Sequence, residues 1–164
     1  IDVCAGRLGR GEEVARDDVH GFVRFIREYA DALHHGKEED MLFQDLMQRG
    51  MSREAGPLAV MYAEHDEGRG YVGTIAAIAE GEGPFDDADR GTIANAMRAY
   101  TGLLRDHILK EDQVLYVMAR QLLPPPAMED LGKRFAHFAE SDPRAAPHDE
   151  LLALAAGLAE RYAD

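Results

Sequence analysis

The chain has 164 residues, a length that fits one domain with a single substantial core. Its net charge of −13, from 31 acidic and 18 basic residues, argues against nucleic acid or an anionic membrane as a partner. No apolar run approaches the roughly 20 residues that span a bilayer, and no signal peptide is visible. The single cysteine, Cys4, cannot form an internal disulfide, so we expect a reducing, cytoplasmic setting.

The composition predicts an all-α protein, because Ala, Leu, Glu and Arg are frequent and β-branched runs are nearly absent. The first residues read as the last two turns of a helix whose beginning lies upstream of Ile1. Apolar residues then recur at helical spacing in three long segments, at about residues 12–48, 57–80 and 87–123.

Turn signals separate these segments from one another and from two shorter helices. Asp86 or Asp87 can cap the third long helix, and the proline run 124–126 ends it. The shorter helices are predicted at about residues 127–140 and 148–163, with Ser141-Asp142-Pro143 between them.

A ten-residue pattern occurs twice, as HHGKEEDMLF at residues 34–43 and as HILKEDQVLY at residues 107–116. Aligned without a gap, the copies pair His34 with His107 and Glu38 with Glu111. Residues four apart lie about 40° from each other on a helix surface. Each copy can therefore point an imidazole nitrogen and a carboxylate oxygen at the same spot.

These side chains lie on faces that are otherwise apolar. Counted at about 100° per residue, His34 with Glu38 faces the interior better than His35 with Glu39. His107 and Glu111 lie in the middle of the apolar stripe of the third long helix. The second long helix places His65 in the middle of its own inward row.

A buried carboxylate is costly unless a cation or hydrogen bonds compensate it. One cationic centre would satisfy both Glu38 and Glu111 and the three imidazoles. Five donors of mixed nitrogen and oxygen type exceed what one tetrahedral zinc requires, so the set favours two metal ions, with iron the natural choice. The alternative is a group of ordinary core histidines with chance His–Glu pairs, which a single copy of the pattern would favour.

Several neighbouring residues remain open in role. His35 is an additional ligand, a residue that orients Glu38, or an exposed side chain. Glu39 and Asp112 are surface acids or acids that orient a ligand. Tyr100 packs between helices or lines a ligand pocket. The remaining histidines are predicted to lie outside the site: His20, His137 and His148.

The segments HHGKEEDMLF, EHDEGR and HILKEDQVLY resemble the three consecutive ligand-bearing helices of the hemerythrin-like HHE cation-binding family. The resemblance implies an up-down-up-down four-helix bundle at about residues 1–123, with a truncated first helix and two extra C-terminal helices at about residues 127–163, all in one domain. It also implies a non-haem di-iron centre, bridged by carboxylates and an oxo or hydroxo group. The implied ligands are His34, Glu38, His65, His107 and Glu111, with the two glutamates as bridges.

The sequence departs from the family at two positions. The family's first helix supplies a further histidine, which is missing or lies upstream of Ile1. The oxygen carriers of the family have another histidine one turn after the position of His65, where this chain has Arg69. An arginine cannot ligate iron, but it could pair with a carboxylate or hold an anionic ligand. This argues against simple reversible oxygen carriage and leaves an open iron position.

We therefore expect a protein that binds oxygen, nitric oxide or peroxide at a di-iron centre for sensing, scavenging or stress response. Because no acid–base pair can be named outside the ligand set, a binding protein is favoured over an enzyme, with weak peroxidase or catalase-like turnover as the enzymatic variant. Two alternatives are iron or other metal homeostasis without redox work, and a metal-free helical interaction module.

Overall fold

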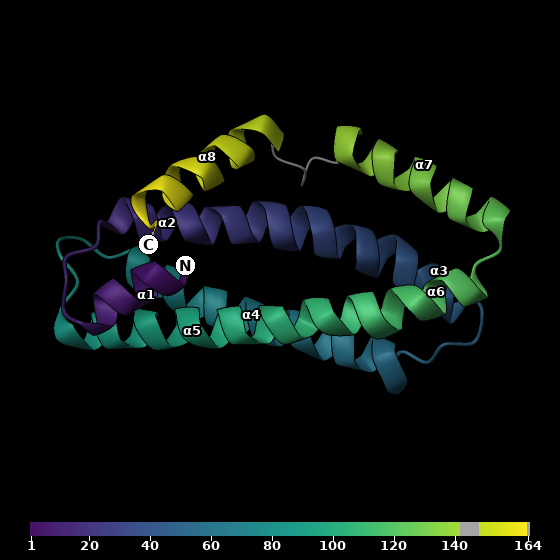
Figure 1. Cartoon of the computed structure of the whole chain (residues 1–164), viewed down its shortest axis with the longest axis horizontal. Coiled ribbons are helices and arrows are strands. Elements are labelled where there is room, and N and C mark those ends of the chain that lie inside the picture. Colours follow the sequence, from purple (N-terminus) through teal and green to yellow (C-terminus); the bar gives the residue numbers. More distant parts are fainter. Residues whose placement is uncertain (142–147, 164) are drawn as a thin grey trace.

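The computed structural model describes residues 1–141 and 148–163, and in this part of the chain every regular element is a helix. Three long rods lie side by side, with a short helix packed at one end and two outer helices alongside (Figure 1). The short helix is α1 (Asp2–Gly9). The first rod comprises α2 (Arg16–Phe25), η1 (Ile26–His35), η2 (Glu38–Leu42) and α3 (Phe43–Met47). The second is α4 (Gly56–Ala79), and the third comprises α5 (Asp87–Lys110), η3 (Glu111–Leu115) and α6 (Tyr116–Leu122).

The outer helices are α7 (Pro125–Ser141) and α8 (His148–Arg161). The structure confirms the predicted all-α bundle with two extra C-terminal helices. Asp86 is the cap of α5, since its side chain accepts a hydrogen bond of 2.8 Å from the main-chain nitrogen of Asp89. The next helix begins within the proline run, at Pro125 rather than at the predicted residue 127, and it ends at Ser141, so Ser141 is helical. Asp142 and Pro143 lie outside the described residues.

The apolar core is divided into two clusters along the bundle. One cluster joins α1, α2 and α8 to the later half of α4 and the earlier half of α5, with side chains such as Leu8, Val19, Ile75, Ile93 and Leu158. The other joins α3, α6 and α7 to the beginning of α4, with Leu46, Leu58, Leu115, Leu131 and Phe138. On the second and third rods, His65, His107 and Glu111 lie between the two clusters and are themselves buried.

Three segments of the rods, η1, η2 and η3, are π-helical. Two of them begin at the repeated glutamates, Glu38 and Glu111, and each passes into α-helix five residues later, at Phe43 and Tyr116. From the glutamate onward, the repeat in the sequence is therefore also a repeat in the backbone, whereas His34 lies in π-helix and His107 in α-helix. π-Helical turns are rare and are frequent at functional sites.

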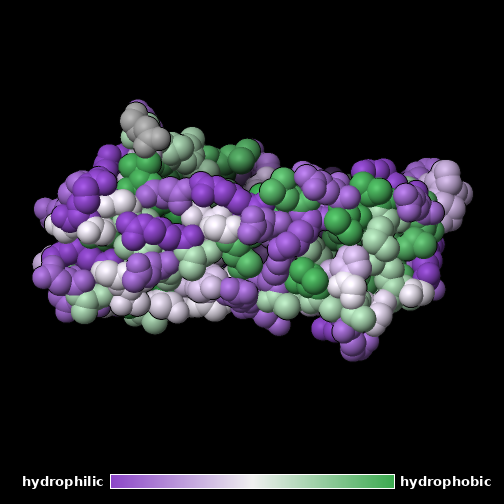
Figure 2. All heavy atoms as spheres, turned by 60° about the horizontal axis from the view of Figure 1, so that its bottom comes forward, coloured by the Kyte–Doolittle hydropathy of each residue, from purple (hydrophilic) through white to green (hydrophobic). Residues whose placement is uncertain are grey.

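The face in Figure 2 mixes hydrophilic and hydrophobic side chains, with many of the hydrophobic ones over its right-hand half. Exposed apolar side chains on the second and third rods are Val60, Ile108, Leu109, Val114 and Leu122. Among the described residues, none of the helices combines the length and the apolar character needed to cross a bilayer.

Candidate metal centre

Four buried donors meet between the rods. A carboxylate oxygen of Glu38 and of Glu111 and a ring nitrogen of His65 and of His107 all lie within 4.8 Å of one another. The Nε2 atoms of the two histidines are 3.2 Å apart. Glu111 Oε1 is 3.2 Å from His107 Nε2, and Glu38 Oε2 is 3.5 Å from His65 Nε2. Each of the three rods contributes, so the cluster exists only in the folded bundle.

Outer carboxylates fix the orientation of the two buried imidazoles. Glu39 Oε1 lies 2.7 Å from His65 Nδ1, and Glu64 Oε2 lies 2.9 Å from His107 Nδ1. Glu64 is also paired with Lys110. An ionised carboxylate can only accept a hydrogen bond, so each Nδ1 is the donor and each neutral ring presents the lone pair of Nε2 toward the centre. Such carboxylate–histidine pairs commonly support metal-ligating imidazoles.

When both rings are neutral, the inward-facing atoms are electron-rich and lack hydrogen donors. Within the described part of the chain, Glu38 Oε2 and Glu111 Oε1 are buried without a hydrogen-bond partner. Two such oxygens beside two imidazole lone pairs would be strongly unfavourable in an apolar setting unless cations or protons compensate them. The residues present therefore fit a metal site, since a bound cation would satisfy all four donors together.

The pKa values of the metal-free side chains show the same demand for positive charge. Burial by itself would lower the pKa of His65, but Glu38 and Glu39 outweigh it and raise this pKa to about 9. Against the same effect of burial, Glu111 and Glu64 raise the pKa of His107. Burial would raise the pKa of Glu111, yet His107 and His34 lower it. The buried carboxylates therefore favour protonation of these rings, so that protons and a cation compete for the same ring nitrogens.

The two adjacent histidines of the first copy do not lie as predicted. His34 Nε2 approaches Glu38 Oε2 at 3.8 Å and Glu111 Oε1 at 3.6 Å, but the His34 side chain is 45% exposed. The His35 side chain is only 12% exposed, and its Nδ1 lies 3.1 Å from Asp31 Oδ1. The expectation that His34 with Glu38 faces the interior better than His35 with Glu39 is therefore right for the glutamates, since Glu38 is the more buried acid, and wrong for the histidines. Its angular count assumed α-helix, whereas η1 is π-helical and turns less per residue.

Sequence reasoning did not identify three side chains that contact the donors. Tyr116 donates a hydrogen bond of 2.7 Å to Glu38 Oε1. Glu64 and Asp31 hold His107 and His35. No local signal pointed to Glu64, because its partner lies 43 residues away on another rod. Asp31 stands four residues before His35, a spacing that could have been noticed.

Other predictions for the neighbourhood agree with the structure. Glu39 orients a ring, as one of its two predicted roles required, whereas Asp112 is exposed. Tyr100 lines a cavity of about 200 Å³, whose other walls are Ile26, Arg27, Asp31, His35, Gly68, Arg69 and Val72. The histidines predicted to lie outside the site are exposed: His20, His137 and His148.

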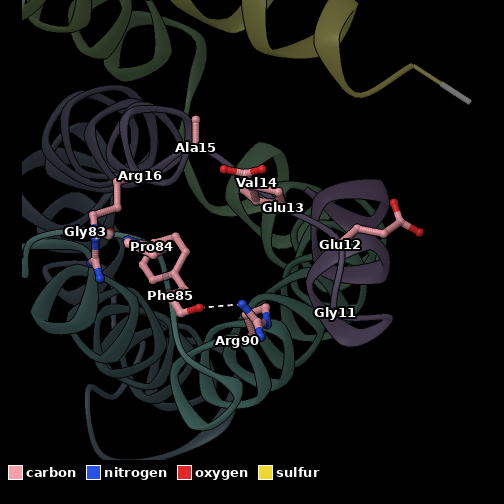
Figure 3. Close-up of a pocket in the computed structure, with 10 residues that line it drawn as sticks. All are labelled: Gly11, Glu12, Glu13, Val14, Ala15, Arg16, Gly83, Pro84, Phe85 and Arg90. Atoms are coloured by element: carbon pink, nitrogen blue, oxygen red, sulfur yellow. Dashed lines mark hydrogen bonds between the residues drawn. The ribbon is translucent and has the colours of Figure 1, made fainter.

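A larger cavity of about 560 Å³ lies where the connection from α1 to α2 meets the connection from α4 to α5 (Figure 3). Its arginines are engaged by main-chain carbonyls. Arg16 donates to the carbonyl of Gly83 at 2.6 Å, and Arg90 donates to that of Phe85. No histidine is among its wall residues, so we do not place the metal centre there.

Comparison with known proteins identifies the family. Residues 2–119 match the hemerythrin HHE cation binding domain. The chain belongs to the hemerythrin HHE family. The match covers both copies of the ten-residue pattern and His65, and it establishes a helical protein of a cation-binding family. The four-donor cluster is the candidate position for that cation.

Relatives of this HHE protein include proteins of different description. Uncharacterized protein Rv1995 of Mycobacterium tuberculosis is 26% identical over 129 residues, which is 79% of this chain and 50% of the relative. Iron-sulfur cluster repair protein YtfE of Salmonella newport is 35% identical over 109 residues, which is 58% of this chain and 47% of the relative. The chain thus spans about half the length of the curated relatives it matches. No solved structure gave a significant match.

Proposed function

We propose that this chain is a cytoplasmic non-haem di-iron protein that binds oxygen, nitric oxide or peroxide for sensing, scavenging or stress response. The proposed protein ligands of the two irons are His34, Glu38, His65, His107 and Glu111. Glu38 and Glu111 are the proposed bridges, because they come from different rods and each turns one buried oxygen without a hydrogen-bond partner toward the cluster. The observation that supports this most is the pair of buried carboxylate oxygens without hydrogen-bond partners, facing imidazole lone pairs.

The number and type of donors favour two irons over one zinc. Four buried donors already lie within 4.8 Å of one another, and His34 Nε2 lies within 3.8 Å of both glutamates. Imidazole and carboxylate together suit iron. A carboxylate has two oxygens, so it can bind two metal ions at once. Membership of a cation-binding family supports a metal as the occupant.

The cavity beside His35 supports access by a small molecule. Its volume of about 200 Å³ could hold several molecules of water size, each of which occupies roughly 30 Å³ in the liquid. Ile26, Val72 and Tyr100 give it apolar walls, and Asp31 with Arg69 closes one side by an ion pair. A small, uncharged molecule suits such a pocket better than a large polar substrate does.

Bound iron would supply the redox and ligand-exchange chemistry. The side chains around it have a supporting role, in which Glu39 and Glu64 keep the ring protons outward and Tyr116 holds one oxygen of Glu38. Among the described residues, the only carboxylate and imidazole that line the cavity are those of Asp31 and His35, which are bonded to each other. This favours binding over turnover, with weak peroxidase or catalase-like activity as the catalytic variant.

Metal analysis and an absorption spectrum of protein purified without chelator test the proposal. We expect about two irons per chain and the bands of an oxo-bridged di-iron centre in the oxidised protein. Nitric oxide added to the reduced protein, or peroxide added to either state, should change the spectrum. A chain that neither contains metal nor takes up iron would contradict the proposal and favour a helical interaction module.

A cavity-filling variant tests the access route separately. Gly68 lines the cavity, and the first carbon of the side chain added in Gly68→Leu lies 3.6 Å from Tyr100 Cε2, another wall residue. The variant should slow nitric oxide binding several-fold while the iron content stays unchanged. Gly70→Leu, on the same helix and in open space, is the matched control. Equal rates in both variants and the unmodified protein would exclude this route.

Iron handling without redox turnover is the second candidate. The name of one relative, iron-sulfur cluster repair protein, favours it. In that case the protein should release its iron to a competing chelator within minutes, and peroxide should leave the spectrum unaltered. Tightly held iron with a peroxide-sensitive spectrum favours the first candidate.

A further inference from the structure

Arg69 contacts three carboxylates around the cavity. Its Nε lies 2.9 Å from Asp31 Oδ1, and its Nη2 lies 2.8 Å from both Asp31 Oδ1 and Glu39 Oε1. Its Nη1 lies 3.0 Å from Asp66 Oδ1. The guanidinium is planar and presents several donors at fixed angles, so it can hold two acids in a defined relation where a lysine would act as a point charge.

The two inner acids each share one oxygen between Arg69 and an imidazole. Asp31 Oδ1 is 3.1 Å from His35 Nδ1, and Glu39 Oε1 is 2.7 Å from His65 Nδ1. Both rings therefore donate from Nδ1 and keep the lone pair of the other nitrogen free for a cation. In the part of the chain that the structure describes, Arg69 is the one cation that pairs with both acids.

His35 and His65 are stacked on each other by this arrangement. Their ring centroids are 3.8 Å apart with an interplanar angle of 12°. The ring of His35 also meets that of His107 edge-on, with centroids 5.9 Å apart. A ring nitrogen of each of the three histidines lies within 4.8 Å of the others. The contacts form a closed loop: His35, Asp31, Arg69, Glu39, His65 and back to His35.

Arg69 is what keeps the two acids together. Without its charge, Asp31 and Glu39 would face each other across a partly buried space, and like charges at this range repel. Glu39 is still held by His65, whereas Asp31 is held by His35 on the same π-helical turn and can move outward with it. His35 is therefore the ring that would leave the site.

We propose that Arg69 is a positioning residue that, through Asp31, makes His35 an additional nitrogen ligand of the metal centre. This inference rests on the proposed function, because it assumes that the four-donor cluster holds metal. It also gives Arg69 a role: it cannot ligate iron from its place one turn after His65, but it fixes a histidine from the neighbouring rod that can.

Cobalt(II) titration tests the proposal without reference to any activity. Arg69→Met should weaken cobalt binding by about 10- to 100-fold, the usual effect of removing a partner that orients a ligand. In the proton NMR spectrum of the cobalt-loaded protein, the hyperfine-shifted N–H signals of coordinated imidazoles should be fewer by one. His35→Phe should lose the same signal, and the double variant should bind no more weakly than His35→Phe alone.

Arg24→Met is the matched control. Arg24 also bridges two carboxylates, those of Glu28 and Glu150, at 3.2 and 2.6 Å, but on the surface. It should leave both the cobalt affinity and the shifted signals unchanged. If Arg69→Met fails to fold, Asp31→Ala breaks the same link while leaving Arg69 on Glu39, and it should remove the His35 signal alone.

The outcomes separate the two proposals. Cobalt binding by the unmodified protein with no change in Arg69→Met or Asp31→Ala overturns the role of Arg69 and leaves the metal site intact. Loss of affinity with every imidazole signal retained also overturns it, because His35 is then not a ligand. Failure of the unmodified protein to bind cobalt or iron overturns the proposed function, and with it the inference.

Discussion

The two copies of the ten-residue pattern share a π-helical turn that begins at their glutamate, but their histidines differ in both backbone and side-chain environment. Each places a glutamate at the start of a π-helical turn. His107 of the second copy is 4% exposed and has both ring nitrogens engaged, whereas His34 of the first copy is 45% exposed. The first copy contributes instead through its neighbours: His35 stacks on His65, and Glu39 holds it. The repeated sequence therefore determines which residues carry the donor atoms. Contacts with the other rods determine how buried each donor is and how many partners it has.

The largest expected effect comes from removing a proposed bridge. Glu111→Ala should abolish binding of at least one metal ion, because it deletes a buried donor that His107 and His34 both approach. The rise in melting temperature on adding iron should then shrink, since that rise comes from binding to the folded state. Metal analysis and thermal melts measure both. His148→Ala should change neither the metal content nor the rise in melting temperature. If the two variants behave alike, the site assignment is wrong.

Alanine variants of His34 and His107 test directly whether the difference in their exposure matters for metal binding. His107→Ala should weaken iron or cobalt binding by more than the roughly 10- to 100-fold typical of losing an outer partner. It also leaves Glu64 without its imidazole. His34→Ala should weaken binding less, because its ring is more exposed and lies farther from the glutamate oxygens than that of His107 does. Isothermal titration compares them, and a stronger effect of His34→Ala would reverse the ranking of the copies.

The aromatic residue that ends each copy differs by one hydroxyl group. Tyr116 donates to Glu38, whereas its counterpart in the first copy is Phe43. Tyr116→Phe should destabilise the metal-free protein by about 1.5–3 kcal/mol, the usual worth of a hydrogen bond to a charged group. Denaturant unfolding measures it. Tyr71→Phe removes a bond to Glu67 on the surface and should change stability little. Equal effects would mean that the buried bond adds nothing special.

The pH dependence of the melting temperature should distinguish Glu39 from Asp112, the acids that follow the repeated glutamates. The pKa of His65 in the folded metal-free protein is about 9, above its value of 6.5 in an unfolded chain. Protonated His65 therefore stabilises the fold fully below about pH 6.5, and this contribution is lost as the pH rises through about 9. Melting temperatures should fall by about 3 °C or more over that window. Glu39→Gln should flatten the decline, and Asp112→Asn, its exposed counterpart, should leave it unchanged.

The fold and much of the site followed from periodicity. The three rods, the cap at Asp86 and the end at the proline run were readable because apolar spacing and capping are local properties of the chain. Glu38, His65, His107 and Glu111 stood out because charged or titratable groups on an apolar face require compensation. Family resemblance added the order of the rods, which spacing alone leaves open.

The remainder depends on contacts between rods and on backbone geometry. Glu64 reaches His107 across 43 residues, and Arg69 reaches Asp31 across 38, so no window of sequence contains either pair. The exchange of exposure between His34 and His35 arises from the π-helical turns. These change the angle per residue without any glycine or proline that would mark them in η1.

The division of the apolar core would give a bound metal a second role, in the cooperativity of unfolding. The two clusters meet across imidazoles and carboxylates, so in the metal-free chain little apolar contact joins the ends on the second and third rods. Each end can then open by itself, and amide hydrogen exchange should show two levels of protection. A cation held by donors from all three rods would tie these units together. Loading the protein with metal should merge the two levels into one, so that partial unfolding reports occupancy.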